Sequence, residues 1–395
     1  MNTTRQPLPD LVRAAALFGI AVVNVDFFAH ATSTQQFGIG LATTADKAVW
    51  WIVATLFTLK SYSLFAFMFG VGFEQQWRTA ASEGAAFLPR YLRRMIGLLV
   101  LGLVNIVALF YGDILVAYAL LGSALLLFRH ATPASLRRWA VGLYIVQVLV
   151  VVLLTLSVLA LATLDETALK ASTAAAVQDE AWRLAGYAAT DFATVADTRL
   201  KSWLEDFPFL IGMQGIGALA FMLFGLYAAR TGALEDPAAA HWIRAQRVAL
   251  PMGIALAAAG ASVMVSSKDQ FDPSFMLGFL LLTVGSPLSS YGYLGLLAAW
   301  TRADDSILRR TLMRAGGGSL TAYLLQGLML SLLFSGYGWG LVGTLGAASY
   351  IPLAAIVAML SLLFVSAWRA RYAQAPCEAL LRAWVYLGAR RVRWP

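Results

Sequence analysis

Long apolar stretches separated by short polar loops recur along the chain from about residue 10 to residue 368. Most are about 18 to 25 residues long, the length that a helix needs to cross a hydrocarbon core about 30 Å thick. The pattern therefore predicts an all-α, polytopic membrane protein with about ten transmembrane helices. The predicted spans are residues 10–30, 47–75, 92–111, 113–129, 139–164, 207–230, 248–266, 275–301, 317–335 and 349–368.

The second stretch, 47–75, is too long for one straight span. The polar residues 60–63, beginning with Lys60, interrupt it. Residues 47–59 are therefore either a separate interfacial or re-entrant piece or the first part of span two.

Two polar segments fall outside the predicted spans. Residues 165–206 are rich in alanine and acidic side chains, which indicates amphipathic helices in an extracytoplasmic insertion. Residues 369–395 place apolar side chains at helical spacing among bases that include Arg390, Arg391 and Arg393, which predicts a cytoplasmic amphipathic helix on the inner leaflet. The domain organisation is thus a single transmembrane domain, 1–368, followed by this tail.

Composition supports a membrane protein. Hydrophobic residues make up 60% of the chain and charged residues 13%, about half the charge of an average soluble domain. A net charge of +8 would suit nucleic acid, but the bases lie in short loops between spans, so the expected partner is the lipid bilayer and no nucleic acid. Most bases fall on one side of the predicted topology, which by the positive-inside rule places both termini in the cytoplasm.

The first span carries an unusual number of polar groups for a membrane helix. Arg13 and Asn24 are eleven residues apart, about 20° beyond three turns, so they share one face of the helix. Asp26 and His30 are four residues apart and neighbour each other if the helix continues, so the acid can orient the base for acid–base catalysis. The structural alternative is that Asp26 forms an interhelical hydrogen bond and His30 lies at the membrane interface.

Further polar groups are expected on the outer side. Lys60, Tyr111 and Asp113 would form a substrate-binding or catalytic cluster there with Asp26 and His30. Alternatively, Asp113 caps the helix that follows it, and Lys60 reaches the membrane surface.

Other candidates lie on later spans and at the inner ends. Tyr323 and Gln326 share a helix face and would bind substrate or join helices. Arg93 and Arg94, with Arg13, would bind donor phosphates or act only as topology signals. The sequence contains none of the usual nucleotide-binding motifs or metal-ligand spacings, so no metal site is expected.

Several motifs together resemble the YeiB-type bacterial membrane family, a domain of unknown function. The resemblance extends over nearly the whole chain. The matching segments are DLVR at 10–13, VN at 23–24, KSYSLFAFMFGVGF at 60–73, YLRR at 91–94, GDILVAYALLG at 112–122, LTAYLLQ at 320–326, GYGWG at 336–340 and APCE at 375–378.

That family looks distantly similar to integral-membrane acyltransferases, including the heparan-glucosaminide type and bacterial O-acetyltransferases. The resemblance implies a protein of the bacterial cytoplasmic (inner) membrane that moves an acyl group from a cytoplasmic donor such as acetyl-CoA to an extracytoplasmic sugar or lipid. Acyl-CoA would be a co-substrate, and no tightly bound cofactor is expected. In the O-acetyltransferases a catalytic His follows an Arg after ten intervening residues; here Arg13 matches and Asn24 stands in the His position. His30 is then the candidate base or acyl carrier, with Asp26 and Asp113 as the other candidate catalytic groups.

Two other hypotheses fit the same residues. A transporter or lipid-handling protein would use Asp26, Lys60 and Asp113 as a small-molecule or proton site. A non-catalytic scaffold or sensor would explain the amide at residue 24. The sequence is compatible with a homo-oligomer and does not identify the donor or the acceptor.

Overall fold

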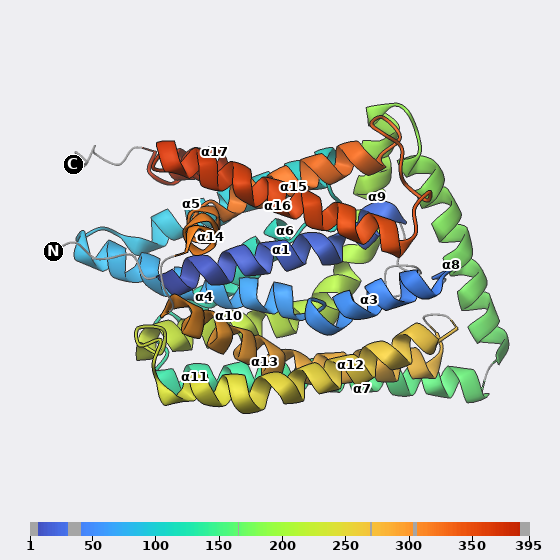
Figure 1. Cartoon of the computed structure of the whole chain (residues 1–395), viewed down its shortest axis with the longest axis horizontal. Coiled ribbons are helices and arrows are strands. Elements are labelled where there is room, and N and C mark those ends of the chain that lie inside the picture. Colours follow the sequence, from blue (N-terminus) through green and yellow to red (C-terminus); the bar gives the residue numbers. More distant parts are fainter. Residues whose placement is uncertain (1–6, 31–40, 165, 269–270, 303–305, 388–395) are drawn as a thin grey trace.

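The computed structural model describes residues 7–30, 41–164, 166–268, 271–302 and 306–387. The regular elements of this part of the chain are helices that run roughly along one axis (Figure 1). Eight helices are long and apolar enough to cross a membrane, which confirms an all-α, multi-span protein. They are α1 (Pro7–Ala29), Thr44–Ser82, α5 (Phe87–Ala108), α7 (Pro133–Leu164), Phe192–Thr231, Ala240–Ser266, α13 (Pro273–Thr301) and α16 (Ala347–Arg371).

Two further predicted spans differ from simple membrane-crossing helices. The helices α14 (Ile307–Gly316) and α15 (Ser319–Phe334) meet at 89° and count together as a ninth candidate. The shorter apolar helix Leu115–Phe128 consists of α6 (Leu115–Ala124) and the 3-10 turn η1 (Leu125–Phe128).

The stretch Thr44–Ser82 is one kinked helix pair. The first helix, α3 (Thr44–Leu56), starts with a capping box in which Thr43 and Asp46 satisfy each other's free N–H groups. It is followed by a break at Leu59, whose φ is 65°, and by α4 (Lys60–Ser82). Residues 47–59 are thus the first part of span two.

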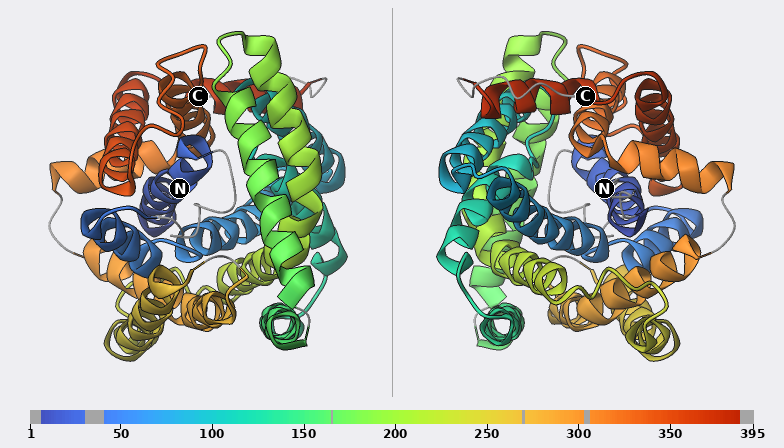
Figure 2. Two further views of the ribbon diagram at one scale, coloured as in Figure 1. Left: turned by 90° about the vertical axis from the view of Figure 1, so that its right-hand side faces the viewer. Right: turned by 90° about the vertical axis from the view of Figure 1, so that its left-hand side faces the viewer.

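The first helix lies inside the bundle, with other helices around it (Figure 2). Its neighbours include α4, α13, α14, α15 and α16. We call the end of the bundle where α1 begins the basic end, and the opposite end, which α8 (Glu166–Tyr187) crosses in Figure 1, the insertion end. The basic end is the one that the charge pattern predicts to be cytoplasmic.

The predicted insertion contains α8 and most of α9 (Phe192–Leu210). The two helices are tied by Arg183, whose guanidinium contacts Asp206 at 2.7 Å, Glu205 at 3.0 Å and Asp179 at 2.8 Å. The helix α9 continues through a π-helical segment, η2 (Ile211–Gly215), into α10 (Ile216–Thr231). The candidate membrane-crossing helix Phe192–Thr231 therefore starts inside the segment predicted from polarity as insertion.

A fully buried arginine fastens α9 to the bundle. The Arg199 guanidinium donates to the Ala108 carbonyl at 2.8 Å and to the hydroxyls of Ser331, Ser335 and Tyr337 at 2.6, 2.8 and 3.1 Å. These partners lie at the ends of α5 and α15, so one side chain closes the insertion end over three helices.

The predicted tail helix is present as α17 (Pro376–Val385), which packs on α5. The Glu378 carboxylate accepts hydrogen bonds from Leu320 N at 2.7 Å and from the Thr321 hydroxyl at 2.6 Å. It therefore caps α15, whose own N-cap, Gly318, has no capping side chain. Residues 388–395 of the predicted tail, with Arg390, Arg391 and Arg393, lie outside the described residues.

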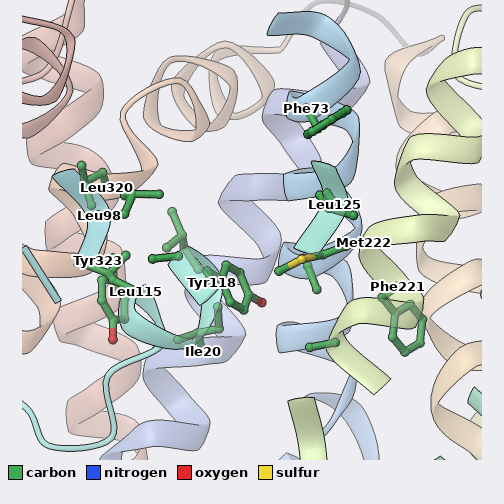
Figure 3. Close-up of a cluster of buried hydrophobic side chains, with 14 of the residues drawn as sticks. Ile20, Phe73, Leu98, Leu115, Tyr118, Leu125, Phe221, Met222, Leu320 and Tyr323 are labelled. Carbon is green, nitrogen blue, oxygen red and sulfur yellow. The ribbon is translucent and has the colours of Figure 1, made fainter. Parts of the chain in front are cut away.

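The helices α12 (Leu250–Ser266) and α7 lie at the periphery of the bundle. The short helix α11 (Ala240–Arg244) and the π-helical segment η3 (Ala245–Ala249) lead into α12. A central hydrophobic cluster combines side chains from α1, α4, α5, α6, α10 and α15, among them Ile20, Phe73, Leu98, Tyr118, Met222 and Tyr323 (Figure 3). The backbones of α4 and α10 approach so closely that a Cβ on Gly70 or Gly225 would overlap a carbonyl oxygen of the facing helix.

Candidate functional site

A cavity of about 280 Å³ lies at the basic end, and we call it the basic cavity. Three guanidinium side chains line it, those of Arg13, Arg90 and Arg94. The aromatic and amide side chains of α4 and α5 form most of its wall, and Ser319 at the start of α15 adds a helix N-terminus. A cavity with this lining favours an anionic group.

The arginines of the basic cavity are held in different ways. Arg13 donates to Asp10 at 3.1 Å, and Arg90 pairs with Glu83. The Arg94 guanidinium lies 5.5 Å from the centre of the Phe69 ring. Arg93, by contrast, donates to the Leu387 carbonyl at 2.6 Å and so holds the end of α17, whereas Arg13 and Arg94 line the basic cavity.

The tail helix closes one side of the basic cavity through Val385 and Tyr386. The Tyr386 ring lies between two guanidinium groups, with Arg90 at 4.9 Å and Arg382 at 5.3 Å from its centre. The Trp384 indole also donates to the Arg93 carbonyl at 2.7 Å. The C-terminal helix is thus part of this cavity as well as a surface element.

A second cavity, of about 170 Å³, lies further along the bundle, and we call it the central cavity. Its lining is mostly apolar, but it includes Asn24, Asp26, Asp113 and Gln214. Of the two residues that helical spacing placed on one face of α1, Arg13 lines the basic cavity and Asn24 lines the central one. The helix α1 therefore forms part of both cavities.

Asp113 is the most extensively hydrogen-bonded group of the central cavity. Its carboxylate accepts from Asn105 at 2.7 Å, from Val116 N at 2.9 Å and from the Tyr323 hydroxyl at 3.4 Å. The bond from Val116 N caps the first turn of α6, in agreement with the alternative that Asp113 caps the helix that follows it. Asp113 nevertheless lines the cavity, and Tyr323 acts on it as a positioning residue.

Asp26 is buried beside Tyr350 and Trp50, and its Oδ1 has no hydrogen-bond partner among the described residues. A buried carboxylate oxygen without a partner costs free energy. A ligand that donates a hydrogen bond in the central cavity would remove that cost, which makes Asp26 a candidate contact for substrate.

His30 follows the last turn of α1 and does not line the central cavity in the described structure. Its ring contacts the Tyr350 ring edge-on, with centres 5.1 Å apart. Burial lowers the pKa of His30 from 6.5 to about 4, although the Asp46 charge opposes this shift. The imidazole is therefore neutral at pH 7, and its link to Asp26 is a backbone hydrogen bond of 3.1 Å rather than a side-chain pair.

Three other predicted residues are also absent from the described lining of the central cavity. The Lys60 ammonium is fully buried and donates to the Ala54 carbonyl at 3.0 Å, which satisfies the broken end of α3. Tyr111 packs against Phe27 with ring centres 5.8 Å apart. Gln326 donates to the Ser361 hydroxyl at 3.0 Å and joins α15 to α16.

An aromatic partition separates the two cavities, made of Phe65, Phe69 and Tyr118. The Tyr118 ring stacks on Phe65 at 5.7 Å and meets Phe69 edge-on at 5.5 Å. Its hydroxyl donates to the Tyr62 carbonyl at 3.0 Å. Tyr118 lines the central cavity and both phenylalanines line the basic cavity.

Sequence reasoning did not single out Arg90, Tyr118 or Gln214. Arg90 lies at helical spacing from Arg94, so the i, i+4 pattern of α5 was an available signal. Tyr118 and Gln214 read as interior polar groups, and only the packed structure shows that they face a cavity. Among the described residues no cluster of His, Cys, Asp and Glu side chains has the arrangement of a metal site.

The chain is similar to two proteins that are each described as uncharacterised. Residues 228–388 match the family model described as "Protein of unknown function (DUF418)". YxaH of Bacillus subtilis (strain 168) is 27% identical, over 96% of this chain and 93% of that protein. YeiB of Escherichia coli (strain K12) is 26% identical, over 94% of each chain. No solved structure shows a significant match.

Proposed function

We propose that this chain, a YeiB-type membrane protein, transfers an acyl group from acyl-CoA at the basic cavity to an acceptor in the central cavity. The observation that supports this most strongly is the different lining of two cavities along the same helices, one with three arginines and one mostly apolar with two carboxyl groups. An anion suits the arginines of one cavity, whereas the described lining of the other offers it carboxyl groups and no cationic side chain. Two different substrates, an anionic donor and a hydroxyl or amine acceptor, suit the pair better than one substrate passing through both.

In the proposed reaction the donor phosphates contact Arg13, Arg90 and Arg94. The acyl thioester passes the aromatic partition, and the acceptor oxygen or nitrogen attacks its carbonyl carbon. The bond from carbon to acceptor forms and the carbon–sulfur bond breaks, so coenzyme A leaves as the thiolate. Asp26 takes the acceptor's proton, because Oδ1 is free to receive it, and the proton passes on to the thiolate.

The test uses purified protein in nanodiscs with Cys377→Ser, so that a thiol reagent reports only released coenzyme A. Acetyl-CoA is the donor, and glucosamine and monooleoylglycerol are the acceptors. Asp26→Asn should abolish release while leaving acetyl-CoA binding unchanged. Arg94→Gln should weaken binding about tenfold or more, because a lost charge-assisted hydrogen bond costs about 1.5–3 kcal/mol.

The matched control is Glu235→Gln, an exposed carboxylate at the basic end that lines neither cavity. It should behave as the parent protein. Absence of saturable acetyl-CoA binding in folded protein would refute the donor assignment. Unchanged turnover in Asp26→Asn would remove Asp26 from the reaction.

Transport is the second candidate, because the broken helix at Leu59 and the partition between cavities are features that transporters share. It predicts solute flux across sealed vesicles without coenzyme A release. Flux of the same solute with no turnover would favour transport over transfer.

A further inference from the structure

The central cavity is closed on three sides by packed side chains. Toward the insertion end, Phe28 stacks on Phe110 with ring centres 4.5 Å apart, and Arg199 fixes the carbonyl of Ala108. Toward the basic end lies the aromatic partition. A substrate entering from either end of the bundle must displace one of these layers.

The wall made by α3, α12 and α13 is also closed. Trp50, Met264 and Phe279 line the cavity and are exposed by only 3%, 1% and 5%, respectively. They belong to a large hydrophobic cluster that continues outward from the cavity. Entry through this side would require opening that cluster.

The remaining wall faces the predicted bilayer. It is made by α6 and the π-helical segment η2, and we call it the α6–η2 seam. Its lining residues Ala117, Leu121, Leu210 and Gln214 are only half-buried. Helices with π-helical segments depart from regular hydrogen bonding, and such segments occur frequently at functional sites.

The outer surface of the seam is apolar. Leu120 and Phe209 are 50% and 59% exposed, and a Cβ on Gly212 would meet no atom within 4 Å. No described side chain therefore covers the seam at Gly212. At the inner side the polar atoms of Asp26 and Asp113 lie in a mostly apolar cavity.

We infer that the acceptor is a membrane lipid with a free hydroxyl or amine headgroup, which enters sideways through the α6–η2 seam. The apolar chain stays in the seam and the bilayer, and the headgroup reaches Asp26 and Asp113. A cavity of about 170 Å³ is close to the volume that holds one benzene-sized group, so it admits a headgroup and not a whole sugar lipid. The role of the lipid as acceptor rests on the proposed transfer reaction. The lipid-binding site itself does not depend on turnover.

The direct test is photo-cross-linking with a diazirine-bearing monoacylglycerol in nanodiscs, followed by peptide mapping. We expect cross-links on α6 and on residues 207–215. Gly212→Trp should block the seam and reduce these cross-links roughly tenfold, which corresponds to about 1.4 kcal/mol. The matched control is Gly142→Trp on α7, where a Cβ also meets open space, and it should leave the cross-links unchanged.

The outcomes separate the two proposals. Seam cross-links without acyl transfer would leave the lipid site standing and overturn the transfer reaction. Transfer to glucosamine with no seam cross-links would leave the reaction standing and overturn the lipid acceptor. Equal cross-linking of parent and Gly212→Trp, with both proteins folded by thermal scanning, would overturn entry through the seam.

Discussion

The substitution Glu378→Ala should release the tail helix α17 from the bundle. The Glu378 carboxylate accepts from Leu320 N at 2.7 Å, from Thr321 N at 3.3 Å and from the Thr321 hydroxyl at 2.6 Å. Loss of a helix cap costs about 0.5–2 kcal/mol, and loss of a negative charge at a helix N-terminus costs about 0.3–1 kcal/mol. Together they predict that α17 docking weakens by about 1–3 kcal/mol.

The chain contains its own reporter for this change. Cys377, the only cysteine, is half-buried next to Glu378, and its backbone N–H donates to the Thr321 hydroxyl at 3.0 Å. Burial raises the pKa of the Cys377 thiol, so the docked thiol is less reactive than a free one. Undocking exposes the sulfur and lowers its pKa toward the ordinary value, and both effects increase labelling.

The assay is the rate of maleimide labelling of Cys377 in detergent at pH 7.5. A change of 1–3 kcal/mol in docking predicts a rate increase of about 5- to 150-fold. Glu378→Gln keeps one acceptor oxygen and should give a smaller increase, while the exposed control Glu235→Ala should give none. Equal labelling rates in the parent protein and Glu378→Ala would refute the reasoning that this carboxylate holds α17.

Two further predictions concern packing and pH. Gly225→Ala should lower the free energy of unfolding by about 1–3 kcal/mol, because its Cβ would overlap the carbonyl of Phe67. The control Gly142→Ala should not lower it, because its Cβ meets open space. Equal melting temperatures for the two variants would contradict the close approach of α4 and α10. The parent protein should lose stability as pH falls from 6.5 to 4, by up to about 1.4 kcal/mol per pH unit from His30, because only the unfolded chain takes up a proton there. In thermal scans the melting temperature of His30→Gln should depend less steeply on pH than that of the parent protein. An identical slope for the two proteins would argue against a buried neutral imidazole.

The helical membrane architecture could be predicted because apolar runs and basic loops are local properties of the sequence. Where the structure differs from the prediction, the deciding contacts join residues that are far apart in the sequence. The helix α9 begins at a local cap, Asp191, but it is fastened to the bundle by Arg199, whose partners on α5 and α15 are far away in sequence. The start of α15, just after the right-angle turn from α14, is likewise capped by Glu378, which follows more than fifty residues later.

The candidate site could be predicted only in part. Helical spacing placed Arg13 and Asn24 on one face, and the structure gives that face two cavities. The spacing of Asp26 and His30 predicted a catalytic pair, but α1 ends at Ala29 and His30 packs on Tyr350 instead. A period of four residues holds only while the helix continues, and the end of a helix depends on tertiary contacts.

The position of α17 in the sequence has a consequence for biogenesis. The segment follows every membrane-crossing helix, yet Val385 and Tyr386 complete the basic cavity. During synthesis, the earlier helices can enter the bilayer while the start of α15 still lacks its cap. The cavity can therefore form only after the bundle has been made, and a ribosome that stops early would leave a membrane-inserted protein without a finished basic cavity.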